Sequence, residues 1–213
     1  PIMIDAEESW FQNTIDQIAL EASVEFNRSK AIVIQTLQMY RHDRLEFLNQ
    51  CLKHAQENSY VPGFKVVRGA YMEKEREQAD LGGYKDPIQT DKDATDHDTH
   101  QAIEILLQHP NAFLCLGTHN RSTCVWATEL MDRFGLDNNS ERIIFAQLLG
   151  MSDSLSVELA DAGYRVAKYL PYGPVDKVLP YLLRRARENS SASGELSREY
   201  ALLLAEQRQR RQE

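Results

Sequence analysis

Short apolar runs alternate along this chain with longer segments in which apolar residues recur every three or four positions. The short runs predict buried strands over residues 2–4, 31–37, 64–67, 112–116, 142–148 and 165–170. The periodic segments predict helices, two of them marked by the stripes Phe11, Ile15, Ile18, Ala22, Phe26 and Leu45, Leu48, Leu52, Ala55. Further helices are predicted over about 95–107, 122–134, 152–162, 174–189 and 195–209.

The alternation of strands and helices predicts βαβ units, which form a parallel sheet with right-handed crossovers. Polar residues follow all six strands: Asp5 and Glu7; Gln38; Arg68 and Tyr71; Thr118, His119 and Asn120; Gln147; Tyr169 and Tyr172. A closed barrel collects ligand contacts from every strand end, whereas an open sheet concentrates them at one switch point. The spread therefore favours a barrel over residues 1–194, followed by a C-terminal helix over 195–213.

Length and charge narrow this prediction. The 213 residues fall short of the about 250 that an eight-stranded barrel uses, so strands are expected to be missing. Lysine and arginine number 24 against 32 acidic residues, and this net charge of −8 argues against nucleic acid as a partner. Three scattered cysteines indicate a reducing compartment. The chain begins with Pro1, so we expect a trimmed N-terminus, and no window is apolar enough to span a membrane.

Two sequence features suggest anion or ligand binding. Arg184 and Arg185 are adjacent in a predicted helix, and paired guanidinium groups can grip a carboxylate or phosphate. A surface helix with an Arg184–Glu188 ion pair would explain the same residues. Residues 117–120, Gly-Thr-His-Asn, lie between a strand and a helix, where either a ligand-binding turn or an ordinary helix cap is found.

Two other features have a functional and a structural interpretation. An acidic and histidine-rich cluster, Asp93, Asp96, His97, Asp98 and His100, has spacing that could hold a metal ion, although such residues also crowd helix starts. Tyr169 and Tyr172 end the last predicted strand, where tyrosine closes an apolar pocket or simply forms a half-buried rim.

Several segments together resemble proline dehydrogenase, the flavoenzyme family that oxidises L-proline. They appear in the family's order and cover nearly the whole chain: residues 4–7 (IDAE), 35–40 (QTLQMY), 65–76 (KVVRGAYMEKER), 117–120 (GTHN), 145–152 (FAQLLGMS), 167–174 (AKYLPYGP) and 181–189 (YLLRRAREN). The sequences of these segments are most similar to those of the eukaryotic-like branch of the family.

This resemblance implies a (β/α)8 TIM-like barrel whose N-terminal strand or strands are missing from this chain, so that a further N-terminal segment is needed to complete it. FAD would lie across the C-terminal ends of the strands and accept a hydride from L-proline, which becomes 1-pyrroline-5-carboxylate. Electrons would pass to a quinone, with peripheral membrane association. The expected location is the matrix side of the mitochondrial inner membrane, or the bacterial cytoplasm or inner membrane surface.

The resemblance also implies roles for individual residues. Arg184 and Arg185 would hold the substrate carboxylate, Tyr169 and Tyr181 would pack around the proline ring, and Asp5 would belong to the polar network behind them. Tyr71 would lie at the flavin–substrate end of its strand. Flavin contacts are implied for Gln38, Gly69, Ala70, Thr90, Thr118, His119, Asn120, Gln147 and Glu188, with no metal. Bifunctional bacterial members have arginine at the position of Lys65 and lysine at that of Arg68, so either cation could reach the flavin N5 region.

Two other functions are compatible with the residues. A metal-dependent barrel hydrolase or lyase would use the Asp93–His100 cluster and contain a divalent ion. A non-catalytic or incomplete barrel fragment would bind neither flavin nor proline.

Overall fold

The computed structural model describes residues 1–176, 178–179, 182–183 and 208. Six parallel strands form one sheet in sequence order: β1 (Ile2–Ile4), β2 (Val33–Gln38), β3 (Gly63–Val67), β4 (Phe113–Gly117), β5 (Ile143–Leu148) and β6 (Val166–Tyr169). Every predicted strand is confirmed to within two residues at each end. The central strands β2 to β5 are buried or half-buried, which suits continuous apolar runs, whereas the edge strands β1 and β6 are more exposed.

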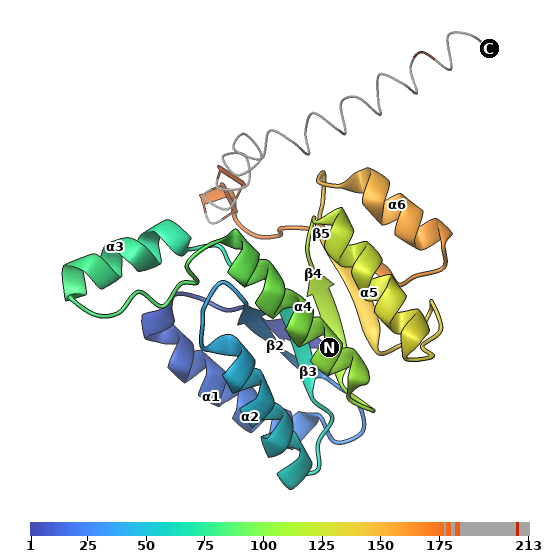
Figure 1. Ribbon diagram of the computed structural model, residues 1–213, viewed down its shortest axis with the longest axis horizontal. Coiled ribbons are helices and arrows are strands. Elements are labelled where there is room, and N and C mark those ends of the chain that lie inside the picture. Colours follow the sequence, from blue (N-terminus) through green and yellow to red (C-terminus); the bar gives the residue numbers. More distant parts are fainter. Residues whose placement is uncertain (177, 180–181, 184–207, 209–213) are drawn as a thin grey trace.

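Six helices connect or follow the strands: α1 (Ser9–Phe26), α2 (Arg44–Glu57), α3 (Met72–Gly82), α4 (Lys92–Gln108), α5 (Arg121–Arg133) and α6 (Asp153–Asp161). Right-handed crossovers between strands in unbroken order place the helices on one face of the sheet, as Figure 1 shows for α1, α2, α4 and α5. A doubly wound sheet would reverse its strand order and carry helices on both faces. The described residues thus form an α/β half-barrel, in agreement with the predicted truncated barrel.

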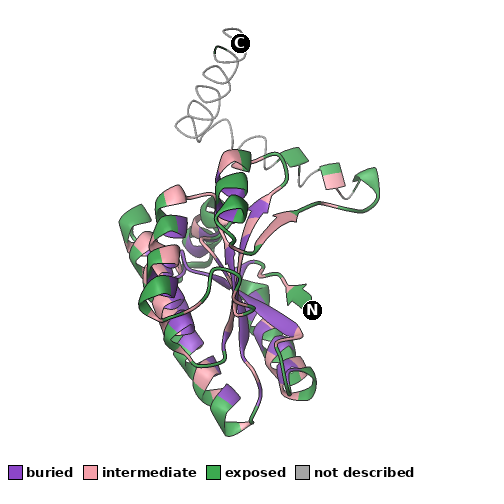
Figure 2. Ribbon diagram, turned by 90° about the vertical axis from the view of Figure 1, so that its right-hand side faces the viewer, coloured by how far each residue is buried: buried purple, intermediate pink, exposed green. Residues whose placement is uncertain are grey.

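The hydrophobic core lies between the sheet and the helices. Side chains from one face of β2 to β5, including Leu37, Val66, Leu116 and Phe145, pack with buried residues of α2, α4, α5 and α6. Figure 2 shows the strands and the inner sides of the helices as the buried part of the molecule. Burying such side chains stabilises the fold by about 1.5–3 kcal/mol each, which holds the strand ends in place.

Helix α1 does not bury its apolar stripe. Instead it turns Gln12, Asp16, Ala19 and Ser23 toward β2, and leaves Phe11 58% exposed. Ile18 and Phe26 of the same stripe are 56% and 54% exposed. The stripe is therefore present as predicted, but it flanks the helix instead of covering the sheet.

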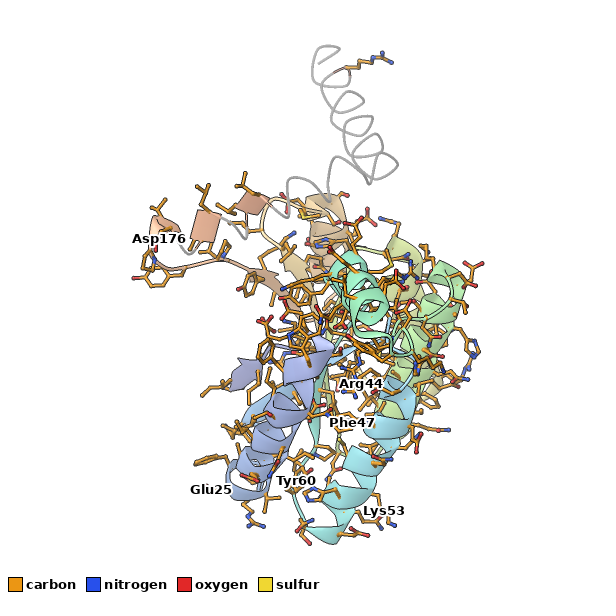
Figure 3. All side chains as sticks on the ribbon, turned by 90° about the vertical axis from the view of Figure 1, so that its left-hand side faces the viewer. Glu25, Arg44, Phe47, Lys53, Tyr60 and Asp176 are labelled. Carbon is orange, nitrogen blue, oxygen red and sulfur yellow. The ribbon has the colours of Figure 1, made fainter. Side chains whose placement is uncertain are left out.

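A buried polar network explains this orientation. The Asp16 carboxylate accepts hydrogen bonds from Gln12 Nε2 and Gln35 Nε2, each at 2.7 Å, and from Arg44 Nη1 at 2.8 Å. Figure 3 labels Arg44, whose guanidinium also donates to Asp43 and lies 4.5 Å from the centre of the Phe47 ring. A buried charge needs such partners, so α1 is held to β2 and α2 by hydrogen bonds more than by apolar contact.

Asp43→Asn is expected to destabilise the fold at neutral pH, with a difference from the parent protein that shrinks in acid. Burial raises the pKa of the Asp43 carboxyl, but hydrogen bonds and charges from Arg44 and Arg41 outweigh it and hold this pKa well below its usual range. A carboxylate with a depressed folded-state pKa stabilises the fold above its unfolded pKa of about 4, and this contribution is lost as the pH falls below that value.

Urea denaturation of both proteins between pH 7 and pH 2 measures this difference. Exposed Asp80→Asn on α3 is the matched control. A gap between parent and Asp43→Asn that stays constant down to pH 2 would contradict the assignment.

One helix of the structure was not predicted, and three predicted features lie wholly or partly outside the described residues. Helix α3 was not predicted, because its residues are mostly charged and it buries only Glu75 and Ala79. The predicted helix over 174–189 is partly outside the described residues. So are the helix over 195–209, except Arg208, and the proposed domain boundary at residue 194. Within the described part of the chain, no helix has both the length and the apolarity to cross a membrane.

Candidate active site

The face of the sheet that points away from the helices, here called the inner face, carries the candidate site. Neighbouring residues in register point to the same side of a sheet, and successive residues alternate. One inner row contains Thr36, Lys65, Cys115 and Ile144, and the next contains Gln38 and Val67 and, on neighbouring strands, Gly117, Ala146 and Ala167. These rows bring residues from five strands together.

Lys65 and Asp5 form an ion pair on this face. The Lys65 ammonium donates to Asp5 Oδ1 at 2.5 Å, and Thr36 Oγ1 donates to the same oxygen at 3.3 Å. The Lys65 side chain is 18% exposed and that of Asp5 is 54% exposed, so the pair is reachable from the inner face. This arrangement holds a cation in a fixed position beside open space, which suits a centre where negative charge develops.

Small residues lie on the side of Lys65 toward β4, β5 and β6. Gly117, Ala146 and Ala167 occupy equivalent positions on β4, β5 and β6. A Cβ atom added to Gly117 would lie 2.9 Å from Val67 Cγ1 and 3.7 Å from Lys65 Cε. Glycine therefore keeps this part of the face low, that is, free of protruding side chains. A low, apolar surface next to a fixed cation fits a flat aromatic ring system carrying an acceptor atom.

Arg68 points to the opposite side, toward the helices. Its Nε donates to Asp96 at 2.7 Å, Nη1 to Thr118 at 2.7 Å and Nη2 to Thr123 at 3.0 Å. These partners lie on or next to α4 and α5, so Arg68 ties the end of β3 to the helix layer. Of the two cations that could reach a flavin, the geometry places Lys65 on the inner face.

The loop between β1 and α1 is bonded to two other predicted site residues. Gln38 Nε2 donates to the backbone oxygen of Glu7 at 2.8 Å, and Gln38 Oε1 accepts from the Ala70 amide at 3.3 Å. The Tyr71 hydroxyl donates to Glu7 Oε2 at 2.8 Å.

Gly69 has φ of +139° and passes over the Tyr40 ring, where a Cβ would lie only 2.4 Å from a ring carbon. Glycine thus permits the chain to turn from β3 into α3.

The turn over residues 117–120 is both a helix cap and part of a polar chain at the strand ends. Asn120 Oδ1 accepts from the Thr123 amide and caps α5, as the structural interpretation predicted. Thr118 Oγ1 accepts from Arg68, and His119 Nδ1 is hydrogen-bonded to Ser152 Oγ at 3.1 Å.

Two further predicted flavin contacts lie apart from the Lys65–Asp5 pair. Gln147 faces the helix layer and is bonded to Ser156 and the Thr118 carbonyl, so its side chain points away from the inner face. Thr90 is exposed in the segment before α4, where its hydroxyl donates to Asp91. The structure therefore groups Asp5, Lys65 and Gln38, and leaves Gln147 and Thr90 outside that group.

The C-terminal part of the predicted site is only partly described. Tyr169 ends β6 on the inner side and is 45% exposed. Tyr181, Arg184, Arg185 and Glu188 lie outside the described residues. Their assigned contacts with substrate and flavin stay predictions from the resemblance.

The acidic and histidine-rich cluster of α4 does not gather into a metal site. Asp96 pairs with Arg68 and Lys92, Asp98 accepts from Gln89, and the His100 ring stacks on Trp126 with centroids 4.5 Å apart. Burial and the Arg68 charge lower the pKa of His100. In the part of the chain that the structure describes, no three His, Cys, Asp or Glu side chains are grouped so as to hold a metal ion. The geometry gives no support to a metal-dependent hydrolase or lyase.

Comparison with known proteins identifies the class of protein. The family described as proline dehydrogenase matches residues 1–198, so this chain belongs to the proline dehydrogenase family. It is 38% identical to mitochondrial proline dehydrogenase 1 of Drosophila melanogaster over 98% of this chain and 32% of that protein. It is 37% identical to hydroxyproline dehydrogenase of Xenopus laevis over 98% of this chain and 46% of that protein. The expected eukaryotic-like branch is confirmed by these relatives.

Solved structures support the fold. A structure of proline utilization A from Bdellovibrio bacteriovorus, inactivated by N-propargylglycine, superposes with a TM-score of 0.84 at 24% identity, covering 93% of this chain and 20% of that one. The chain spans about a third to a half of the length of these curated relatives.

Glu7 and Glu75 are site neighbours that sequence reasoning did not single out for a contact. Both residues belong to segments that carry the family resemblance, but no role is implied for Glu7 beyond that of a polar residue after a strand, and Glu75 lies in a highly charged segment that looks exposed. In the structure Glu75 is fully buried. A buried glutamate among exposed ones gives no periodic signal, so the sequence offered no way to find it.

Proposed function

We propose that this chain forms the catalytic part of a proline dehydrogenase, which oxidises L-proline to 1-pyrroline-5-carboxylate with FAD as hydride acceptor. The Lys65–Asp5 pair on the inner face of a half-barrel from this family is the observation that carries the proposal. It provides a cation fixed by Asp5, which directly follows the C-terminal end of β1, the end of the strands at which barrel enzymes perform their chemistry.

The residues present fit FAD. Gln38 and Lys65 offer polar groups beside the low surface of Gly117, Ala146 and Ala167, and the turn at residues 117–120 lies at the N-terminus of α5. We assign Gln38, Lys65 and Gly117 to the isoalloxazine, and Thr118, His119 and Asn120 to the remainder of the cofactor. When bound, FAD supplies the two-electron redox chemistry, which protein side chains lack.

The contribution of the chain itself is orientation and electrostatics. The Lys65 ammonium stabilises negative charge that develops near it during oxidation, and Asp5 keeps this ammonium in place. Arg184 and Arg185 hold the substrate carboxylate as a bidentate pair. Tyr169 and Tyr181 cover the proline ring, exclude water and fix which carbon faces the acceptor.

We also propose the partners and location that this chemistry needs. The two electrons pass from FAD to a quinone, so the protein associates peripherally with a membrane. A mitochondrial location on the matrix side of the inner membrane agrees with the name of the Drosophila relative, and the corresponding site in a bacterium is the cytoplasmic membrane surface.

Completion of the barrel requires a further segment next to β1. Within the described residues β1 is an edge strand, and Ile2 is 66% exposed. On a helical wheel, the exposed stripe of α1 lies about 90° from the buried face of the helix. The stripe also lies on the side of α1 away from Leu20 and Val24, which line a groove together with His54 of α2. This flank therefore faces the open edge of β1. We propose that a strand pairs with β1 while a helix covers this flank, because exposed edges and apolar stripes favour association.

Anaerobic visible spectroscopy of the protein supplied with FAD tests the proposed function. Bleaching of the flavin band on adding L-proline is the expected result, and trans-4-hydroxyproline serves as the competing substrate. A flavin band that neither amino acid bleaches would contradict proline oxidation. Absence of any flavin band would favour an incomplete, non-catalytic fragment.

A further inference from the structure

Helix α1 receives its N-terminal cap from another helix. Its N-cap residue, Glu8, makes no side-chain capping bond, and the first turn carries no acidic residue. Instead the Glu75 carboxylate of α3 accepts from the Ser9 amide and from the Ser9 hydroxyl, both at 2.6 Å. Glu75 is 0% exposed. Its charge is compensated by these two hydrogen bonds and by the positive end of the α1 dipole.

Three more contacts join the same two segments. Tyr71, which precedes α3, donates to Glu7. The Lys74 ammonium pairs with Glu8 and lies 5.7 Å from the centre of the Trp10 ring. Together with the Glu75 bonds, these contacts form a clasp, defined as residues 71–75 on one side and residues 7–10 on the other.

The clasped loop leads directly to the candidate active site. Two residues before Glu7 is Asp5, which pairs with Lys65, and the Glu7 carbonyl accepts from Gln38. A shift of this loop therefore moves Asp5 and Gln38 together. The Glu75 carboxylate bonds to Ser9 and not to Asp5 or Gln38, so its effect on these two residues passes through the loop.

We propose that Glu75 is a positioning residue for the reaction: it fixes the loop between β1 and α1 so that Asp5 holds the Lys65 ammonium on the inner face. The proposal rests on the proposed function. A buried carboxylate is costly to a fold, and one that joins α3 to the start of α1 has its effect where the site is built.

Hydrogen exchange tests the first part of the proposal without any substrate. Glu75→Ala is expected to increase amide exchange at residues 7–12 by at least about tenfold, while β2 and β4 keep their protection. Exposed Glu77→Ala on the same helix is the matched control and should change neither region. If Glu75→Ala does not fold, Ser9→Ala removes one of the two bonds and is expected to give a smaller change at the same residues.

Proline kinetics in the FAD-loaded protein test the second part. Glu75→Ala is expected to lower kcat by about 10- to 100-fold with KM for L-proline changed less than about threefold, because a misplaced Asp5 affects the charge-stabilising cation more than carboxylate binding. Glu75→Gln is expected to restore most of the lost kcat, since an amide can accept from the Ser9 amide and donate to its hydroxyl.

The outcomes separate this proposal from the proposed function. Unchanged exchange at residues 7–12 in Glu75→Ala would overturn the clasp, and unchanged kcat, or a kcat that Glu75→Gln fails to restore, would overturn the positioning role. If the parent protein binds FAD but does not oxidise proline, the proposed function fails and the kinetic role of Glu75 fails with it, while the exchange result still decides the clasp.

Discussion

Replacing Lys65 with methionine is expected to slow the reduction of bound FAD by L-proline by about 10²- to 10³-fold, the range found when a charge-stabilising group is removed from an active site. Methionine keeps the volume of the aliphatic stem but removes the ammonium that Asp5 holds. The effect should appear in kcat, because this cation acts on charge that develops during the reaction. Anaerobic stopped-flow reduction, followed at the flavin band, measures it.

Two control variants make this result specific. Lys85→Met changes an exposed lysine of the segment after α3 and should leave the rate unchanged. Arg68→Met should lower thermal stability, because Arg68 joins β3 to Asp96 and Thr118, with a smaller effect on the rate. A slow Arg68→Met protein beside an unaffected Lys65→Met protein would reverse the assignment of the two cations.

Arg185→Met is expected to raise KM for L-proline by about 100-fold, since losing a charge-assisted bond to a carboxylate costs about 1.5–3 kcal/mol. Arg185 lies outside the described residues, and its role comes from the resemblance to proline dehydrogenase. The amount of bound FAD should stay the same, because the arginine pair is assigned to the substrate alone. Steady-state kinetics together with the flavin-to-protein absorbance ratio measure both quantities.

The matched control for this variant is Arg208→Met, which removes an exposed arginine. Its KM should equal that of the parent protein. An unchanged KM in Arg185→Met, or a loss of flavin in proportion to activity, would remove Arg185 from the substrate carboxylate.

The strands were predictable because their signal is local. Each is a run of three to seven mostly apolar residues, and this pattern is visible without knowledge of neighbouring strands, most clearly for the largely buried strands β2 to β4. The barrel prediction followed from polar residues at every strand end, and the sequential strand order supports it. Helix α4 begins at Lys92, earlier than predicted, because Asp91 accepts from the Ala94 amide and caps it.

The orientation of α1 and the existence of α3 were not predictable from periodicity. The apolar stripe of α1 suggested a buried face, but the three hydrogen bonds to Asp16 from Gln12, Gln35 and Arg44 decide which side meets the sheet. Two of these partners are 19 and 28 residues away in sequence. Helix α3 shows no apolar stripe, and polar contacts of Glu75 and Tyr71 with residues 7–9 hold it in place instead.

By itself, the sequence determined the family, the six strands, and the fact that Lys65 and Arg68 face opposite sides, since residues three apart in extended chain point in opposite directions. It did not determine which of the two faces the inner side. Only the tertiary structure decided that, because the choice depends on where Asp5, Asp96 and Thr118 lie once β1, α4 and β4 are packed. Side-chain direction within a strand is local information, whereas the side that becomes the interior depends on partners far away in the chain.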